Sequence, residues 1–498
     1  MPSSASPLDR PSLPALCVDL DGTLVKSDTL VDSALVLARQ RPADLLKLPG
    51  WLLQGKAALK QHLTAAVQLQ VAHLPYNREL LQYLQQQHAT GRPIYLATAA
   101  DATLARRVAD HLGIFTDVLA SNGTLNLAGN NKLAAFQQRF GDNFSYIGNA
   151  RPDLPLLTHC QQPMVANPTA SLRAGLRAAR ITPVRSFTEQ VSPLRAWFKA
   201  LRIHQWAKNA LIFLPLLLAH AWSPNLLAAS AIAFLSFGLC ASATYIVNDL
   251  LDLEADRQHP RKRRRPFASG DLSAIAGVAV VLFFLAISAT LAILLPRISA
   301  AVAPSGVIVT PYHISFLGWL AVYLVTTLAY SLRLKRAVLV DVIVLSGLYT
   351  IRILAGSAAT GVTVSPWLGG FSIFFFLSLA FVKRFAELES LRERGGASAS
   401  GRGYHVADLE QLRSFGTASG YASVVVLTLY ISNLSAAQLY HHTNRLWLLV
   451  PVLLLWLSNL WLLASRGQLN EDPVVYAVTD KRSLLLGALV VAVVLISL

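Results

Sequence analysis

Apolar and polar positions divide the chain into two differently patterned parts. Up to about residue 200, short apolar runs alternate with stretches in which apolar residues recur at helical spacing. The runs 15–18, 94–97 and 145–147 each end at polar residues, which is typical of buried strands in a parallel α/β sheet. Residues 26–90 read as almost wholly helical, so we expect a helical cap between the first two strands.

Beyond residue 200 the pattern changes to long apolar stretches without charged side chains. Uncharged stretches of about 20 residues are long enough to cross a bilayer as helices. Nine candidate spans follow one another, at roughly 209–222, 227–248, 272–295, 313–331, 338–356, 366–382, 418–439, 446–464 and 483–498. The expected fold is therefore an N-terminal α/β domain plus an all-α polytopic membrane domain of nine transmembrane helices.

Three segments follow from this pattern. We expect the α/β domain at 1–167, a basic linker at 168–200 and the membrane domain at 201–498. Trp197 and Phe198 stand among basic residues near the end of the linker, a composition typical of a helix that lies at the membrane interface. An ordinary amphipathic linker helix fits the same pattern.

The distribution of charge adds a topology. The chain carries 43 Lys and Arg against 27 Asp and Glu, a net charge of +16, although only 14% of its residues are charged and 54% are hydrophobic. Such an apolar composition excludes intrinsic disorder. Twenty of the 23 Lys and Arg beyond residue 200 fall where the chain would face the cytoplasm if its N-terminus does. We therefore expect a multi-pass protein of the inner (plasma) membrane with a cytoplasmic N-terminal domain, in contact with the lipid bilayer and with no nucleic-acid partner.

A cluster of amide and acidic side chains follows the second expected span. Asn248, Asp249, Asp252 and Asp256 fall within about 100° of one another on a helix, so we expect them to share one face, whereas Glu254 falls on the other side. Carboxylates on one face repel each other unless a cation binds them, and oxygen ligands suit Mg²⁺ that also contacts substrate phosphates. A solvated acidic helix end is the alternative.

Cations occur near this cluster and in a later span. The run of five cations that ends at Arg265 either marks the cytoplasmic face and contacts anionic lipid or clamps a diphosphate beside the metal. Asp341 and Arg352 share one face of an expected helix. Because an Arg that faces lipid is costly, we expect both to face a cavity. The alternatives are that Lys335 only snorkels from a loop and that Arg352 binds a backbone carbonyl.

These motifs resemble those of the UbiA-type intramembrane prenyltransferase superfamily. The resemblance rests on Asn248-Asp249-x-x-Asp252-x-x-x-Asp256 and on Arg265-Pro266-x-x-Ser269-Gly270. It is closest to the decaprenyl-phosphate phosphoribosyltransferases and spans about 200–485. The further matches are Leu201-Arg202-x-His204-Gln205-Trp206-x-Lys208-Asn209, His259-Pro260-x-Lys262-Arg263-x-Arg265-Pro266, Tyr330-Ser331-x-x-Leu334-Lys335 and Lys383-Arg384.

The resemblance implies Mg²⁺-dependent transfer of a 5-phosphoribosyl group from phosphoribosyl pyrophosphate to a polyprenyl (decaprenyl) phosphate. Many superfamily members have two or more carboxylates in a second Asp-rich motif, whereas only Asp341 stands at that place here, with Lys335 and Arg352 nearby. This departure fits a site that holds an additional anion. The implied catalytic residues are Asp249 and Asp252, the implied metal ligands are Asp249, Asp252 and Asp256, and the implied substrate-binding residues are Asn248, Lys208, Arg265, Tyr330, Lys335, Asp341 and Arg352.

A second candidate site lies in the α/β part. Asp19 and Asp21 follow the first strand in Asp-Leu-Asp-Gly-Thr, Thr98 ends the second apolar run, Lys132 opens a helix, and Asp153 closes Gly-Asn-x-x-x-Asp after a later strand. This order of motifs over residues 15–165 resembles the haloacid dehalogenase-like phosphatase family, with a Rossmann-like parallel sheet and a helical cap.

That resemblance implies a role for each residue. Asp19 would be the nucleophile, and Asp21 would protonate the leaving alcohol and later activate water. Thr98 and Lys132 would bind the phosphoryl oxygens, and Asp153 would hold Mg²⁺ together with Asp19. Asn149 stands where the family commonly has an acidic residue, so an inactive scaffold is the alternative.

Three functions are open at this point. The first is a bifunctional enzyme that makes a phosphoribosyl lipid and then removes its 5-phosphate. The second is prenyl transfer from a polyprenyl diphosphate to an aromatic acceptor. The third is a lipid-binding membrane protein with a degenerate site and a regulatory N-terminal domain. The polyprenol length and the oligomeric state do not follow from the sequence.

Overall fold

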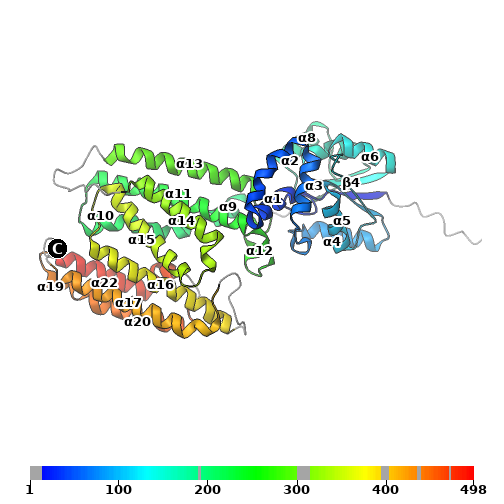
Figure 1. Cartoon of the computed structure of the whole chain (residues 1–498). Helices are drawn as coiled ribbons and strands as arrows, with labels where there is room; N and C mark the ends of the chain where they lie inside the picture. The colour runs from blue at the N-terminus through cyan, green and yellow to red at the C-terminus, as the bar shows by residue number, and fades with distance from the viewer. Residues whose placement is uncertain (1–13, 189–191, 300–313, 394–402, 434–438, 470–472) are drawn as a thin grey trace, which may run out of the picture. The chain divides into compact units, whose positions relative to one another are not determined.

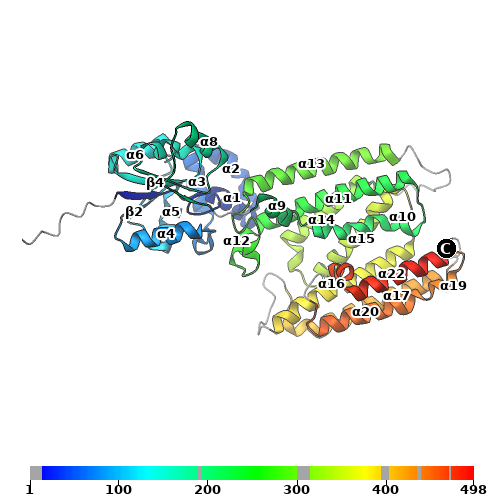
Figure 2. The same ribbon diagram turned by 180° about the vertical axis from the view of Figure 1, so that it is seen from behind.

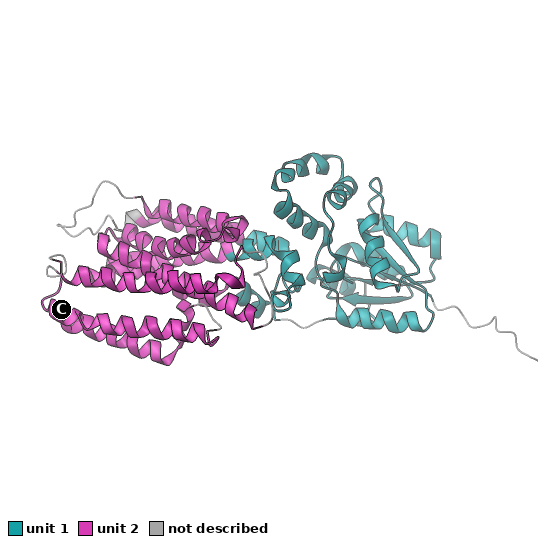
Figure 3. Cartoon of the chain, turned by 60° about the horizontal axis from the view of Figure 1, so that its bottom comes forward, with its two compact units in different colours: residues 1–201, 245–280 teal, residues 202–244, 281–498 magenta. Residues whose placement is uncertain are grey.

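The chain forms two compact units, each built from two separate segments. The computed structural model describes residues 14–188, 192–299, 314–393, 403–433, 439–469 and 473–498. The first unit contains residues 1–201 and 245–280, and the second contains 202–244 and 281–498 (Figure 3). Residues 245–280, which we expected to belong to the membrane domain at 201–498, therefore group with the N-terminal domain.

The first unit contains a six-stranded parallel sheet. Its strands are β1 (Ala15–Val18), β2 (Ile94–Asp101), β3 (Asp117–Ser121), β4 (Phe144–Gly148), β5 (Gln162–Ala166) and β6 (Arg185–Phe187). The strand order β3-β2-β1-β4-β5-β6 changes direction beside β1, so the carboxyl ends of β1 and β4 flank the point where such sheets bind ligands. The expected α/β parallel sheet is confirmed.

Both faces of the sheet are buried because successive residues of a strand point to opposite sides. Leu16 and Val18 of β1 belong to one apolar cluster, whereas Cys17 between them belongs to another. Helices α4 (Arg78–Ala89) and α5 (Ala102–Leu112) cover the first face. The opposite face is covered by α6 (Asn130–Phe140), α7 (Leu154–His159) and α8 (Ala170–Ala178) (Figure 1).

The expected helical cap follows β1 and has an apolar core of its own. It comprises α1 (Thr29–Gln40), η1 (Pro42–Lys47), α2 (Leu48–Leu53), α3 (Lys56–Ala66) and η2 (Val71–His73). Val36 and Leu37 of α1 pack with Leu63 of α3, and the carboxylate of Asp28 caps α1 by accepting from the amides of Leu30 and Val31.

The sheet domain extends beyond the boundary expected at residue 167. Helix α8 and strand β6 lie within the segment that we expected to be a linker, and β6 pairs with β5 through residues 185–187. The rest of that segment contains α9 (Pro193–Leu201), whose Trp197 ring packs edge-on against Phe267. The contribution of α8 was hidden in the sequence because its basic residues resemble those of an interfacial segment.

Near residue 250 the first unit contains the end of one long helix and the start of another. Helix α11 (Pro224–Leu251) is followed by α12 (Leu253–Gln258) and η5 (Lys262–Arg264), and then by α13 (Ala274–Ser299). Helices α11 and α13 continue into the second unit (Figure 3).

The second unit is all α-helical. Besides its parts of α11 and α13 it contains η4 (Ile203–Phe213), α10 (Leu214–Leu218), α14 (Phe316–Leu332), η7 (Leu334–Arg336), α15 (Val340–Thr360), α16 (Pro366–Arg392), η8 (Val406–Asp408), α17 (Leu409–Ile431), α19 (Thr443–Leu446), α20 (Leu449–Ser465), α21 (Pro473–Thr479) and α22 (Lys481–Ser497). Helices α16, α17, α20 and α22 lie side by side (Figure 2).

Six helices in the described residues are long and apolar enough to cross a membrane, and α14 is a shorter apolar helix. They make the chain a multi-pass membrane protein, whereas the count of nine spans stays a prediction. Residues 209–222, expected as the first span, form the end of η4 and the short α10 instead of one helix. Pro215 stands at this junction, where a continuing helix would need its missing N–H.

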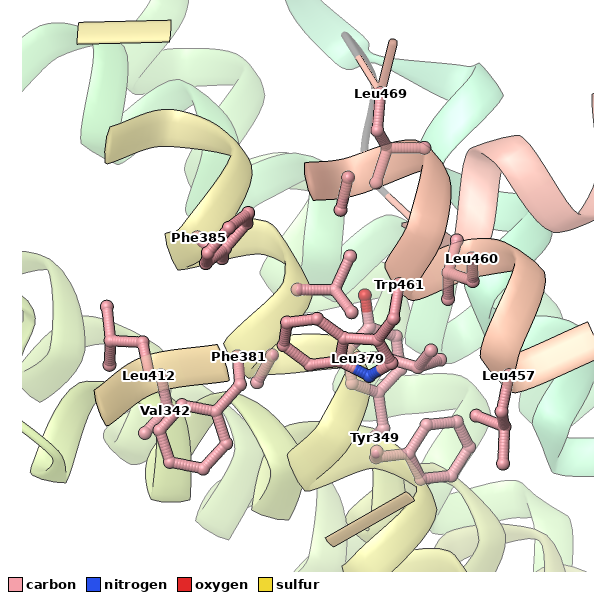
Figure 4. Packing of buried hydrophobic residues seen from close by; sticks show 14 of the residues in the cluster. Val342, Tyr349, Leu379, Phe381, Phe385, Leu412, Leu457, Leu460, Trp461 and Leu469 are labelled. Carbon is pink, nitrogen blue, oxygen red and sulfur yellow. The ribbon is translucent and has the colours of Figure 1, made fainter. Parts of the chain in front are cut away.

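Small residues allow the helices of the second unit to approach closely. A Cβ atom on Gly416 of α17 would lie only 2.2 Å from the indole of Trp461 on α20. The hydroxyl of Ser378 on α16 donates to the carbonyl of Gly416 at 2.7 Å and accepts from the indole N–H of Trp461 at 3.1 Å. Figure 4 shows Trp461 among Leu379, Phe381 and Phe385 in the largest apolar cluster. Such contacts between small residues and polar groups are how membrane helices associate.

Candidate functional site

Two carboxylates of the Asp-rich segment meet at one cation. The Nη1 atom of Arg265 donates to Asp249 at 3.0 Å and to Asp256 at 2.7 Å. Both carboxylates are almost fully buried, with side-chain exposures of 2%. Burial raises the pKa of Asp256, and the charge of Arg265 opposes that rise. Arg265 therefore forms direct ion pairs with two of the acidic residues, and its role in binding a diphosphate stays open.

Asp252 departs from the arrangement that we expected. Helix α11 ends at Leu251, and Asp252 lies between helices with φ −93° and ψ 12°. Its carboxylate lies 3.5 Å from the guanidinium of Arg39 on the cap helix α1, and the amide of Gln70 donates to the nearby Glu254 at 2.9 Å. Asn248 is half-buried one turn earlier. The amides of Asp252 and Asp256 still donate to the carbonyls of Asn248 and Asp252 at 2.9 and 2.8 Å, so the irregularity is local, and the common face of these residues stays a prediction.

These residues fit Mg²⁺ as a pair rather than as a triad. Within the ranges that the structure describes, no three His, Cys, Asp or Glu side chains are grouped closely enough to hold a metal. Asp249 and Asp256, however, place two oxygen donors around one position that already attracts a cation. Two carboxylates that share a metal with substrate phosphates are the usual protein contribution to Mg²⁺ binding.

In the second unit, the carboxylate of Asp341 accepts hydrogen bonds from other side chains. It is fully buried at the start of α15, where Nε of Arg384 donates to it at 2.5 Å and the hydroxyl of Tyr404 also donates to it. Arg384 in turn donates to the Tyr330 hydroxyl at 2.8 Å and to Glu387 at 2.5 Å. Asp341 therefore anchors α15 to α16 and is not an open metal ligand in this geometry.

Arg352 has protein partners as well. Its Nε donates to Asn209 at 2.9 Å, its Nη1 donates to the carbonyl of Leu348, and its Nη2 lies 3.4 Å from the hydroxyl of Tyr323. The sequence left open whether Arg352 binds a backbone carbonyl, and one of its contacts is indeed such a carbonyl. Lys208 is buried with its ammonium 5.7 Å from the centre of the Tyr349 ring, and the guanidinium of Arg352 lies 5.7 Å from the centre of the same ring.

Two expected substrate-binding residues remain partly accessible. Tyr330 is half-buried at the end of α14, and Lys335 is half-buried in η7. Asp341 and Arg352 were expected to face one cavity, but the structure gives each of them a separate set of partners.

The second candidate site lies at the carboxyl ends of β1 and β4. The ammonium of Lys132 on α6 donates to Asp19 at 2.8 Å and to the Tyr146 hydroxyl at 3.0 Å, and it lies 3.9 Å from Asp153. Lys132 is 3% exposed. Lys132 and Asp19 are 113 residues apart in the chain and are in direct contact. The resemblance to the haloacid dehalogenase-like phosphatases implied that both belong to one site.

Hydrogen bonds fix the carboxylate of Asp153. One oxygen accepts from the amides of Asn149 and Ala150 at 3.0 Å each, and the other accepts from Tyr146 at 2.7 Å. Gly148 is required beside it, because a Cβ atom there would lie 2.7 Å from the carboxylate. With Asp19 facing the same ammonium, the two carboxylates supply the oxygen donors that suit Mg²⁺.

Asn149 lies against the turn that follows Asp19 and Asp21. Gly22 has a positive φ of +73°, and a Cβ atom on it would lie 2.0 Å from the Asn149 amide nitrogen. The side chain of Asn149 therefore lies directly beside the turn that contains Gly22.

Burial also sets the ionisation of the two aspartates. Burial raises the pKa of Asp19 to about 6, although the charge of Lys132 opposes it. Burial and the charge of Asp28 raise the pKa of Asp21 to about 7, and the amide of Thr29 donates to Asp21 at 2.7 Å. Burial alone would lower the pKa of Lys132, but the charges of Asp19 and Asp153 more than offset it, so its pKa is raised and the ammonium stays charged.

Thr98 is placed differently from what the sequence suggested. Strand β2 continues past it to Asp101, and the Thr98 hydroxyl accepts from the amide of Ala100 at 3.0 Å. The cavity next to Asp19 is lined by Ala99 and Ala100 instead. The Thr98 hydroxyl thus bonds to the backbone at the end of the strand, and its role in binding a phosphoryl group stays a prediction.

Four residues with important contacts were not singled out as site residues from the sequence. Arg384 was noticed as part of Lys383-Arg384, but its partner Asp341 could not be inferred without the fold. Arg257 follows Asp256 directly, and its ion pair with Asp32 comes from a distant segment. Lys60 in the cap donates to the carbonyl of Ala99 at 2.7 Å. No pattern pointed to the fourth, which is Tyr404.

Comparisons with known proteins identify the family of the membrane part. The model of the UbiA prenyltransferase family matches residues 210–479. An uncharacterized protein, y4nM, of Sinorhizobium fredii is 38% identical over 483 residues, which cover 96% of this chain and 90% of the relative. The decaprenyl-phosphate phosphoribosyltransferase of Mycobacterium tuberculosis is 38% identical over 205 residues, which cover 40% of this chain and 62% of that enzyme.

A solved structure is similar as well. A UbiA homolog from Archaeoglobus fulgidus, bound to GPP and Mg²⁺, matches with a TM-score of 0.44 and 17% identity over 60% of this chain and 99% of that one. The family model covers more than half of the 498 residues and includes the Asp-rich segment. The chain therefore belongs to the UbiA prenyltransferase family.

Proposed function

We propose that the membrane domain transfers a 5-phosphoribosyl group from phosphoribosyl pyrophosphate to a polyprenyl phosphate. The observation that carries this proposal is the set of hydrogen-bond partners of Asp341, the one carboxylate at the place of a second Asp-rich motif. It is neutralised by Arg384 and Tyr404 and so does not provide a second metal site for a prenyl diphosphate. The mycobacterial relative, whose name gives this reaction, supports the same substrates.

Each residue of the Asp-rich segment has a task in this reaction. Asp249 and Asp256 hold the cation at the diphosphate end, and Arg265 between them is a ready donor to a phosphate oxygen. Mg²⁺, when bound, neutralises the charge that develops on the departing pyrophosphate. The bond from ribose C1 to pyrophosphate breaks, and an oxygen of the lipid phosphate forms the new bond to C1. Lys335 and Tyr330, which remain partly accessible, are the candidates for holding the lipid phosphate.

The proposal is tested with detergent-purified full-length protein. Phosphoribosyl pyrophosphate, decaprenyl phosphate and Mg²⁺ should give a phosphoribosyl lipid and pyrophosphate, and Asp249→Asn should lower that rate at least a hundredfold. Glu254→Gln is the matched control, because Glu254 carries a carboxylate in the same segment but accepts from Gln70. A parallel reaction with a polyprenyl diphosphate and 4-hydroxybenzoate tests the rival, and prenylation there with no phosphoribosyl lipid would overturn the proposal.

We also propose that the N-terminal domain is a phosphatase that removes the 5-phosphate from the phosphoribosyl lipid. Its support is the meeting of Asp19, Lys132 and Asp153 at the carboxyl edge of the sheet. Asp19 attacks the phosphorus, the bond to the ribose 5-oxygen breaks, and Asp21 gives that oxygen a proton. Asp21 then takes a proton from the water that releases phosphate. A pKa of about 7 suits both roles near neutral pH.

This second activity has its own readout. Inorganic phosphate should appear after the phosphoribosyl lipid forms, and Asp19→Asn should abolish its release while the lipid product accumulates. The product of the first reaction is the substrate of the second, and we propose that the N-terminal domain meets it at the cytoplasmic face of the inner membrane. Phosphoribosyl lipid that forms without any release of phosphate dependent on Asp19 would refute the phosphatase role.

A further inference from the structure

The cap of the first unit presents a group of apolar side chains to solvent. Within residues 46–56, which we call the cap tip, Leu46 and Leu53 are 86% and 90% exposed, and Leu52 is 52% exposed. A single exposed leucine is common on any protein surface, whereas several close together make an apolar patch that marks an interaction site. The cap tip is therefore a candidate interaction surface.

The core of the cap does not need these leucines. Leu45, Leu48 and Trp51 recur at every third position and pack against the apolar cluster of the cap. This spacing places them on one face of η1 and α2. Leu46 and Leu53 lie outside that face and stay exposed. Their apolar character therefore serves a contact outside the cap.

Contacts within the first unit hold the cap beside the end of a membrane-spanning helix. The span candidate α11 ends at Leu251, and Arg39 of the cap lies 3.5 Å from Asp252, the next residue. The amide of Gln70, also in the cap, donates to Glu254 at 2.9 Å. Because the boundary of the bilayer lies near the end of a spanning helix, these contacts place the cap at the membrane surface.

The next spanning helix begins beside the cap tip. The span candidate Ala274–Leu295 starts one residue before Ile275, which lines the same cavity of the first unit as Leu52 and Lys56. Ile275 is 60% exposed, so this flank of α13 is open to lipid. The cap tip therefore lies next to a lipid-facing part of a spanning helix.

The charges of the cap tip indicate which kind of membrane surface it suits. Lys47 and Lys56 are exposed on either side of α2, and residues 46–56 contain no acidic side chain, although Asp44 just before them pairs with Lys47 at 2.7 Å. Apolar side chains flanked by lysines are typical of segments that lie in the interface of a bilayer with anionic lipids.

We propose that the cap tip inserts Leu46 and Leu53 into the surface of an anionic bilayer, with Lys47 and Lys56 at the lipid phosphates. Insertion removes apolar surface from water, and the attraction between lysines and anionic lipid adds to it. The inference depends on neither proposed enzymatic activity, since it rests on exposure, charge and contacts near the spanning helices. Insertion would keep the cavity of the first unit at the membrane surface.

The test places an NBD fluorophore on the full-length protein in nanodiscs that hold one chain each. Gly50→Cys carries the label, because a Cβ atom at Gly50 meets nothing within 4 Å. The background carries Cys160→Ser, since Cys17 and Cys240 are buried. The discs contain phosphatidylglycerol and phosphatidylcholine. Nitroxide-labelled lipid should quench this label at least threefold more than a label at Val184→Cys, an exposed position at the amino end of β6.

Substitutions of leucines test the apolar contact. In the Gly50→Cys protein, Leu46→Ser/Leu53→Ser should lower the quenching to the level measured at Val184→Cys. Leu125→Ser is the matched control, because it removes an exposed leucine of the first unit that lies outside the cap tip, and it should leave the quenching unchanged.

The lysines are tested with the same label. Lys47→Gln/Lys56→Gln should lower the quenching at least twofold in discs with phosphatidylglycerol and should have no effect in discs of phosphatidylcholine alone. Quenching at Gly50→Cys no greater than at Val184→Cys would overturn the inference. A blue-shifted emission without quenching would overturn it too, because a protein surface would then cover the cap tip. Quenching that responds neither to lipid charge nor to the two lysines would overturn the choice of an anionic bilayer.

Discussion

Asp341 illustrates how a buried carboxylate can be structural in a position where catalytic ones are expected. With an exposed fraction of 0%, it depends on Arg384 for its charge balance, and Arg384 is 1% exposed. Removing one partner of a buried ion pair leaves an uncompensated charge and costs about 3–5 kcal/mol, whereas removing both often costs little. This asymmetry can be measured.

We expect Arg384→Gln to lower the apparent melting temperature of the detergent-solubilised protein more than Asp341→Asn does. The double variant Asp341→Asn/Arg384→Gln should be more stable than the sum of the single losses predicts, because each residue is chiefly needed to balance the other. Thermal unfolding of all four proteins in one detergent measures this. Strictly additive losses would contradict the pairing.

Gly22 offers a second prediction at the scale of one residue. Alanine at Gly22 meets a φ of +73° and the Asn149 side chain, whereas alanine at Gly91 meets a similar φ of +78° with nothing within 4 Å. Both variants should lose roughly 1–2 kcal/mol of stability from backbone strain. Only Gly22→Ala should also lose phosphatase activity, at least tenfold, since Asn149 and the catalytic turn must move apart. Equal phosphatase rates in the two variants would show that Asn149 has no bearing on the site.

At the scale of elements, the pattern of the chain predicted the sheet well and the Asp-rich segment less well. Parallel strands end at the same edge, so motifs after 15–18 and 145–147 had to meet there. Asp19 and Asp153 do, since they lie 2.8 and 3.9 Å from the ammonium of Lys132. The common face of Asp249, Asp252 and Asp256 required an unbroken helix. Helix α11 ends at Leu251 and α12 begins at Leu253, and the hydrogen bonds from the amides of Asp252 and Asp256 to the carbonyls four residues earlier continue across this irregularity.

Contacts between distant segments could not be read from any local pattern. Arg384 and Asp341 are 43 residues apart, and Arg257 and Asp32 are 225 apart. Each lies in a run whose charges have an ordinary local explanation, as a helix end or as a topology signal. Only the fold selects which charge of a run forms an ion pair with a buried carboxylate, as it does for Arg265 among five consecutive cations.

The ion pair between α1 and α12 yields a prediction about two elements. Asp32 is 1% and Arg257 5% exposed, whereas the pair of Asp117 and Arg139 is 49% and 41% exposed. We expect Asp32→Asn to destabilise the first unit by about 3–5 kcal/mol and to increase amide hydrogen exchange at 253–272. Asp117→Asn, the matched control, should cost at most about 1 kcal/mol. Unchanged exchange at 253–272 would mean that this pair does not hold α12.

At the scale of the whole molecule, the chain contains two candidate sites, and whether they act independently can be tested. The Asp-rich segment belongs to the same compact unit as the phosphatase-like site, although the family model places it in the membrane transferase. The two proposed reactions have related substrates: the phosphoribosyl lipid proposed as the product of one is the phosphate ester proposed as the substrate of the other.

Mixing variants separates the two activities. Asp249→Asn should lose lipid synthesis but hydrolyse a supplied phosphoribosyl lipid, and Asp19→Asn should make that lipid without releasing its phosphate. Together in the same micelles, the two variants should restore the complete conversion, because the amphiphilic intermediate stays at the micelle surface and reaches the second protein. Phosphate release should then lag behind lipid formation, and the lag should shorten as the Asp249→Asn protein is increased. Failure of the mixture, with each single activity intact, would mean that the intermediate passes only within one chain.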